Sequence, residues 1–156
     1  MSVQAVAEPV TVILRAPTAG FRRADLEFYG VDHSRSSFTA RLFFNQPTAD
    51  AATPTDEEHG YAGSFHIFGH GGCAGDEGHC EVPTDRRPDD LRPAHQLTPL
   101  TKRVTVTAAL RRALGAGSEL QLTVVAVLRE ELVTSYGADL TSDLLHFDRV
   151  DLITYQ

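Results

Sequence analysis

The side chains best suited to chemistry gather in a short stretch in the middle of this sequence. Five potential ligands for soft metal ions lie there, namely His66, His70, Cys73, His79 and Cys80. Interspersed glycines let the backbone fold back on itself. Zinc and copper(I) favour imidazole and thiolate, and both accept tetrahedral sites of two His and two Cys. We therefore predict that residues 66 to 80 hold one copper or zinc ion.

The preferred ligand set has two histidines and two cysteines, His70, Cys73, His79 and Cys80, with His66 as a reserve ligand. The C-x6-C spacing of the cysteines differs from the pairs found in zinc fingers and ribbons. His66 and His70 have H-x3-H spacing, but positions four apart on a strand lie about 13 Å from each other. These two histidines can converge only if the strand ends near Phe68.

Three other interpretations of this segment are open, and in one of them the cysteines are free structural thiols. Cys73 and Cys80 could form a disulfide that braces a loop of an interaction module without metal, worth roughly 2.5 kcal/mol in chain entropy. Alternatively, a mononuclear metal site with His66 or a water in an open position could be catalytic. A type 1 copper site is disfavoured, because its usual weak axial ligand is Met and the only Met is residue 1.

Alternating apolar and polar residues predict the elements that carry this segment. The alternation indicates strands over 10–15, 24–31, 37–44, 61–68, 102–107, 119–128 and 144–155. The segment 108–114 predicts one short helix, capped by Thr107 and ended by Gly115. Seven or eight strands at this spacing predict an all-β fold, an antiparallel β-sandwich with one short helix and long loops. We expect residues 1–156 to form a single domain.

The predicted connections add three local expectations. The turn-like VDHSRSS predicts a hairpin between the second and third strands. The Pro-containing segment 45–60 should be a solvated loop, with its acidic cluster Asp56, Glu57, Glu58 and His59 hydrated instead of metal-binding. His33, in a turn, and His146, on the outer face of the last strand, are expected at the surface.

Composition and charge exclude several classes of function. The net charge is −7 and the 14 Lys and Arg are scattered, so nucleic acid is not an expected partner. The first residues contain no basic region followed by an unbroken apolar run, which predicts neither a signal peptide nor a membrane span. We therefore expect a cytoplasmic protein that does not interact with membranes.

Three runs also resemble a known family: FTARLFFNQPTADAATPTDEEHGYAGSFHIFGHGGCAGDEGHC, LRPAHQLTPLTKRVTVTAAL and LLHFDRVDLITY. Together they resemble the C-terminal β-sandwich domain of bacterial tyrosinase-like proteins, which are related to polyphenol oxidases and haemocyanins. The resemblance covers residues 24–155 and is strongest over 37–80.

What the resemblance implies is an accessory role and not oxidase activity, because no pair of histidines lies on a readable helix that could hold a dicopper centre. Such domains pack over the copper site of a catalytic domain and shield it with an inserted side chain. In some members cysteines assist copper loading. The matching residues here are Cys73 and Cys80, whose spacing departs from the C-x-x-C pattern of that role. A tyrosinase-like catalytic domain is the implied partner.

Overall fold

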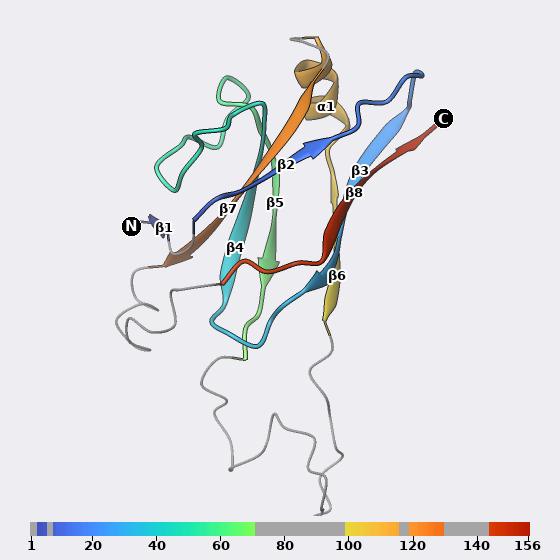
Figure 1. The fold of residues 1–156 in the computed structure, drawn as a ribbon. Coiled ribbons are helices and arrows are strands. Elements are labelled where there is room, and N and C mark those ends of the chain that lie inside the picture. The colour runs from blue at the N-terminus through green and yellow to red at the C-terminus, as the bar shows by residue number, and fades with distance from the viewer. Residues whose placement is uncertain (1–2, 6–7, 71–98, 116–118, 130–143) are drawn as a thin grey trace, which may run out of the picture.

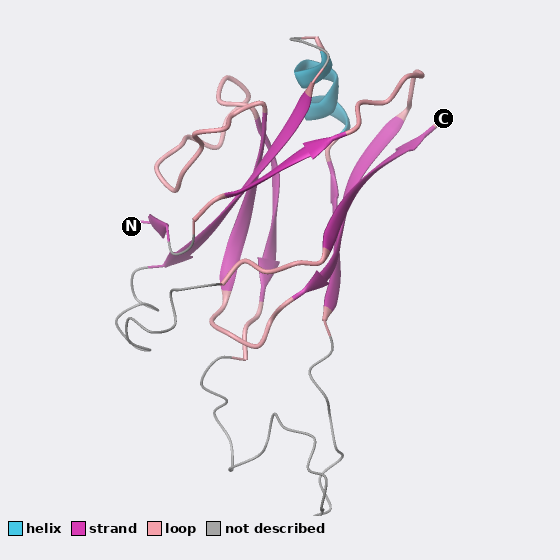
Figure 2. Ribbon diagram, viewed as in Figure 1, coloured by secondary structure: helices cyan, strands magenta, loops and turns pink. Residues whose placement is uncertain are grey.

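The computed structural model describes residues 3–5, 8–70, 99–115, 119–129 and 144–156. Strands dominate this part of the chain (Figures 1 and 2). In chain order the elements are β1 (Val3–Ala5), β2 (Val10–Leu14), β3 (Arg23–Val31), β4 (Phe38–Phe44), β5 (Tyr61–Ile67), β6 (Leu100–Thr105), α1 (Thr107–Leu114), β7 (Leu120–Arg129) and β8 (Arg149–Tyr155).

The strands form two antiparallel sheets that face each other (Figure 2). One sheet has the order β1-β7-β4-β5, with β2 also pairing along β7, and the other has the order β6-β3-β8. The main hydrophobic core is formed by side chains of both sheets. The all-β sandwich predicted from the alternating pattern is confirmed.

The core forms because β3 and β4 each direct every second side chain inward. Leu26 and Phe28 of β3 are fully buried, as is Leu42 of β4. Phe28 links the two sheets, since its ring centroid lies 4.9 Å from that of Phe65 on β5. It also lies 5.2 Å from the ring of Phe147, which precedes β8. Aromatic contacts therefore join three separate segments at the centre of the sandwich.

The second face of β7 is also buried, and this was not expected from the composition of segment 45–60. Val125 is fully buried on that face and packs with Phe43 of β4 and with Ala49 of the segment. Arg41 also donates a hydrogen bond to the carbonyl oxygen of Ala51, at 3.0 Å. Most of the segment is exposed as predicted, but its small alanines can cover a sheet without a large apolar side chain.

The predicted hairpin between β3 and β4 is wrong, because these strands belong to different sheets. β3 pairs with β6 and β8, whereas β4 pairs with β5 and β7. Residues 32–37 cross between the sheets. Asp32 helps to shape this crossing, since its carboxylate accepts a hydrogen bond from the backbone N–H of Ser34 at 2.8 Å. A turn-like composition indicates where the chain bends and not which strands pair.

The predicted helix is present, but Thr107 does not cap it. Val106 occupies the N-cap position without a side-chain capping bond, and Thr107 is the first helical residue. The hydroxyl of Thr107 instead accepts a hydrogen bond from the buried backbone N–H of Ala24, at 3.0 Å. Leu110 is fully buried against the core. The helix ends at Leu114, as its sequence indicates.

The last predicted strand is shorter than expected. Leu144 and Leu145 are buried without being part of a strand, and β8 begins only at Arg149. Backbone bonds fix this irregular stretch, since the N–H of Asp148 donates to the carbonyl oxygen of Tyr29 at 2.9 Å. Leucines in two successive positions fill the core here without strand alternation.

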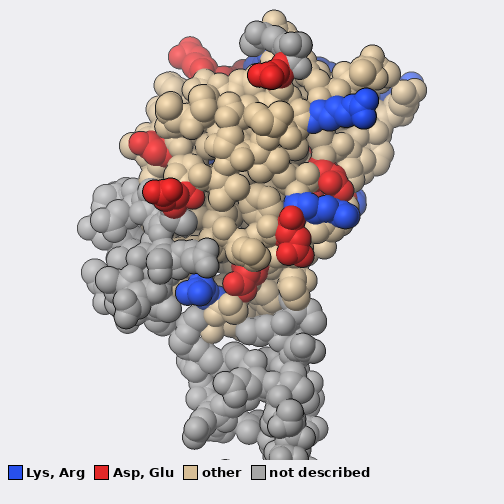
Figure 3. Space-filling view, in the orientation of Figure 1, with Lys and Arg blue, Asp and Glu red and all other residues tan. Residues whose placement is uncertain are grey.

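Charged side chains are dispersed over the visible surface. On the face drawn in Figure 3, Lys and Arg of the described residues do not gather into a patch, and acidic residues lie between them. In the part of the chain that the structure describes, no helix is long and apolar enough to cross a membrane.

Candidate metal centre

Two histidines meet at the end of the sandwich opposite α1, where β3 and β5 both end (Figure 1). His33 follows β3 in the crossing to β4, and His70 follows β5. The backbone N–H of His70 donates a hydrogen bond to the carbonyl oxygen of His33 at 2.8 Å. Two segments that are 37 residues apart in sequence are thus joined at the point where the predicted metal loop begins.

The side chains of these histidines also contact each other. The Nδ1 atoms of His33 and His70 lie 3.1 Å apart, and the two rings are nearly perpendicular, at 80°. Both residues are partly buried. Without a metal, a hydrogen bond at this distance requires one Nδ1 to carry a proton and the other to accept it. We call this arrangement the imidazole pair.

The backbone before His70 is fixed by its close packing against the crossing segment. The N–H of Gly69 donates to the hydroxyl of Ser37 at 3.0 Å. A side chain at position 69 would overlap the backbone of Arg35 and Ser36. Only glycine lets the two chain segments approach this closely, and this approach positions the backbone of His70 beside that of His33.

Replacement of Gly69 with alanine is expected to lower the free energy of unfolding by about 1–3 kcal/mol, because backbone atoms of Arg35 and Ser36 must move. It should also separate the imidazole pair. Urea unfolding measures the first effect, and the ring resonances of His70 report the second. Gly20→Ala is the matched control, since an added Cβ there meets nothing within 4 Å. Equal stability of the two variants would contradict the close approach at Gly69.

His66, the reserve ligand, has a different partner. Its side chain is exposed and its Nδ1 lies 2.8 Å from the hydroxyl of Thr39 on the neighbouring strand β4. His70 lies beyond the end of β5 and pairs with His33. The strand does end at Ile67, close to Phe68, as convergence of His66 and His70 would require, but the described residues contain no cluster of three or more metal-binding side chains.

Three of the predicted ligands lie outside the described residues: Cys73, His79 and Cys80. Their arrangement, and a disulfide between the cysteines, are therefore untested predictions. His33 was expected to be a surface residue, and its contact with His70 was not anticipated. Its only sequence signal is a histidine two residues after a strand, which does not indicate its partner from the other sheet.

Among the described residues, Phe68 is an exposed large apolar side chain near the pair. It is 79% exposed, and its ring centroid lies 5.8 Å from that of His70. An exposed apolar ring therefore lies beside the imidazole pair at this end of the sandwich.

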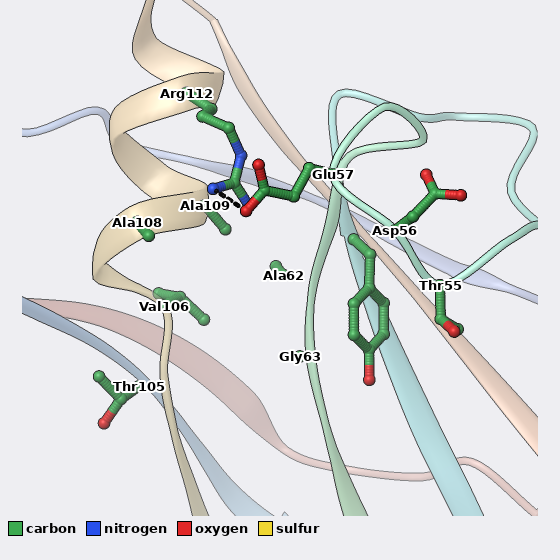
Figure 4. A pocket seen from close by; sticks show the side chains of 11 residues that line it. Thr55, Asp56, Glu57, Ala62, Gly63, Thr105, Val106, Ala108, Ala109 and Arg112 are labelled. Atoms are coloured by element: carbon green, nitrogen blue, oxygen red, sulfur yellow. Dashed lines mark hydrogen bonds and ion pairs between the residues drawn. The ribbon is translucent and has the colours of Figure 1, made fainter.

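A cavity lies at the other end of the molecule, beside α1. This cavity of about 250 Å³ is bounded by α1, the start of β5 and segment 55–57. Arg112 of α1 reaches across it to Glu57, with 3.0 Å between Nη1 and Oε1 (Figure 4). An ion pair therefore occupies the polar part of the cavity.

The acidic cluster near this cavity is exposed, as predicted. Asp56 and His59 form their own pair, with 2.6 Å between Oδ1 and Nδ1, and the pKa of Asp56 is lowered chiefly by that hydrogen bond. Glu57 pairs with Arg112. The first contact stabilises the loop itself, and the second joins the loop to α1.

Comparison with known proteins does not identify a family for this chain. No protein-family model matches the sequence, and no curated protein matches it. The resemblance to the tyrosinase C-terminal domain therefore stands as a hypothesis, and function must be argued from the imidazole pair and the residues that follow it.

Proposed function

We propose that this chain is a metal-binding accessory β-sandwich domain that holds one copper or zinc ion in segment 66–80. The proposal assigns His70 as a ligand together with Cys73, His79 and Cys80. The observation that carries it is the position of His70, whose Nδ1 lies 3.1 Å from a second imidazole nitrogen where the loop begins. Paired imidazoles followed within ten residues by two cysteines match the ligand preferences of zinc and copper(I).

The accessory part of the proposal depends on the resemblance to tyrosinase C-terminal domains. In that role the domain would pack against a tyrosinase-like catalytic chain and shield or load its copper site.

Metal and thiol content of the purified chain test this proposal directly. Protein purified without added metal should contain about one equivalent of copper or zinc by elemental analysis. Its two cysteines should react with a thiol reagent only after denaturation in the presence of a chelator. Cys73→Ser and Cys80→Ser should each lower the metal content, whereas Ser64→Ala, a substitution on β5 away from the loop, should not.

The same measurements separate the alternatives. Absence of metal together with loss of both free thiols would replace this proposal with the disulfide-braced interaction module. Absence of metal with two reactive thiols would also overturn it. If metal is present, four protein ligands support a structural or carrier site, whereas three ligands and a bound water support a mononuclear metal enzyme.

A further inference from the structure

We propose that His33 is a metal ligand, and that His33 and His70 bind one zinc or copper(I) ion jointly through their Nδ1 atoms. This inference rests on the proposed function and gives one of the four ligand positions of that site to a residue more than thirty positions before the predicted loop. His33 then takes the place of one of the ligands assigned within the loop, because a tetrahedral ion has four ligands. It also assigns Nδ1, and not Nε2, as the nitrogen of each ring that binds the metal.

The distance between the two nitrogens fits a shared tetrahedral ion. Two nitrogen ligands at about 2.0–2.1 Å from zinc lie about 3.3 Å from each other in a tetrahedral site. The observed separation of the Nδ1 atoms is 3.1 Å. A linear two-coordinate ion would separate them by roughly 4 Å, twice the metal–nitrogen distance. The pair is therefore arranged for an ion that takes further ligands.

Backbone contacts, and not only the side-chain contact, hold the two histidines together. The His70 N–H donates to the His33 carbonyl oxygen at 2.8 Å, and Gly69 donates to Ser37 at 3.0 Å. A metal ion can thus replace the proton between the Nδ1 atoms without separating the two segments. Such preorganisation lowers the cost of assembling a binding site.

The test is a titration of the full metal-free chain with Zn²⁺, followed by ¹⁵N resonances of the histidine rings. Before zinc, one ring of the pair should carry its proton on Nδ1. At one equivalent, that ring should change tautomer so that both rings are protonated on Nε2, and both Nδ1 resonances should shift to the metal-bound range. Unchanged Nδ1 resonances of His33 at saturating zinc would overturn the inference.

Variants provide a second measurement. His33→Ala and His70→Ala should each weaken zinc affinity by at least about 100-fold. Removal of a residue that only orients a ligand costs up to about 100-fold, and removal of a ligand itself should cost at least as much. His59→Ala is the matched control, because His59 pairs with Asp56 in the loop before β5 and should leave affinity unchanged. Unchanged zinc affinity in a folded His33→Ala protein would contradict the assignment.

These outcomes separate the inference from the proposed function. If Cys73→Ser abolishes zinc binding but His33→Ala does not, the metal site exists without His33 and the inference alone is wrong. If the wild-type chain binds neither zinc nor copper(I), both are wrong. If His33→Ala does not fold, the ring resonances of the wild-type chain decide, since they need no substitution.

Discussion

Replacement of Phe28 with alanine is expected to lower the free energy of unfolding by about 3–5 kcal/mol. Phe28 has no exposed surface, and its ring contacts Phe65 of the opposite sheet and Phe147 before β8. Its removal leaves a cavity where three segments meet. Small domains have total stabilities of about 5–15 kcal/mol, so the loss is a large part of the total. Urea unfolding of both proteins measures it.

Phe68→Ala is the control for this substitution. The same side chain is removed, but Phe68 is 79% exposed, and surface substitutions usually change stability by less than about 0.5 kcal/mol. A loss at Phe28 no greater than at Phe68 would show that the two sheets do not depend on the aromatic contacts between them.

The faces of the strands could be predicted from the sequence, but their partners could not. Alternation correctly placed Leu26 and Phe28 on one face of β3, with Asp25 and Glu27 on the other. The hairpin predicted from residues 31–37 is wrong because alternation carries no information on hydrogen-bond partners. The short connection crosses between the sheets, and β3 instead pairs with β6 and β8, whose paired residues are 69 or more positions away in sequence.

The candidate metal centre could likewise be predicted only in part from the sequence. His70 was predicted as a ligand from local composition, because imidazole, thiol and glycine are close in sequence. His33 was missed because its proximity to His70 depends on β3 and β5 ending at the same end of the sandwich. That arrangement follows from the pairing of both sheets, which no local pattern specifies.

Asp25 shows that an outward-facing position is not always an exposed one. Its side chain has no accessible surface although it lies on the outer face of the sheet, because long neighbouring side chains cover it. Arg23, itself 53% exposed, donates from Nε to Oδ1 at 2.9 Å. Its Nη2 lies 2.8 Å from Oδ2, an electrostatic contact without hydrogen-bond geometry. Arg23 also stacks over the ring of Tyr155, with 5.5 Å to the centroid.

This environment lowers the pKa of Asp25. The hydrogen bond from Arg23 is the largest cause, burial opposes it, and the charges of Arg23 and Arg103 act in the same direction as the hydrogen bond. The ionised carboxylate is therefore more stable in the folded protein than in the unfolded chain. Its contribution to stability is present above the unfolded pKa of about 3.9 and is lost as the pH falls through the folded pKa.

Asp25→Asn is expected to lower the free energy of unfolding at pH 7 by about 1.5–3 kcal/mol, the range for a hydrogen bond to a charged group. The variant keeps the size of the side chain but loses the charge. Below about pH 4 the difference from wild type should shrink, because wild-type Asp25 is then progressively protonated in both states. Urea unfolding at a series of pH values from 7 down to the acid limit of folding measures this difference.

Asp151→Asn separates the effect of burial from that of charge. Asp151 lies on the adjacent strand β8, where its ion pair with Arg149 has 3.4 Å between oxygen and nitrogen and both side chains are about half exposed. Solvent screens such a pair, so its loss should cost no more than about 1 kcal/mol. A loss at Asp25 that persists undiminished in acid would show that amide geometry, and not the missing charge, destabilises the variant. A loss that disappears in acid instead identifies the covered carboxylate as the stabilising group of this sheet face.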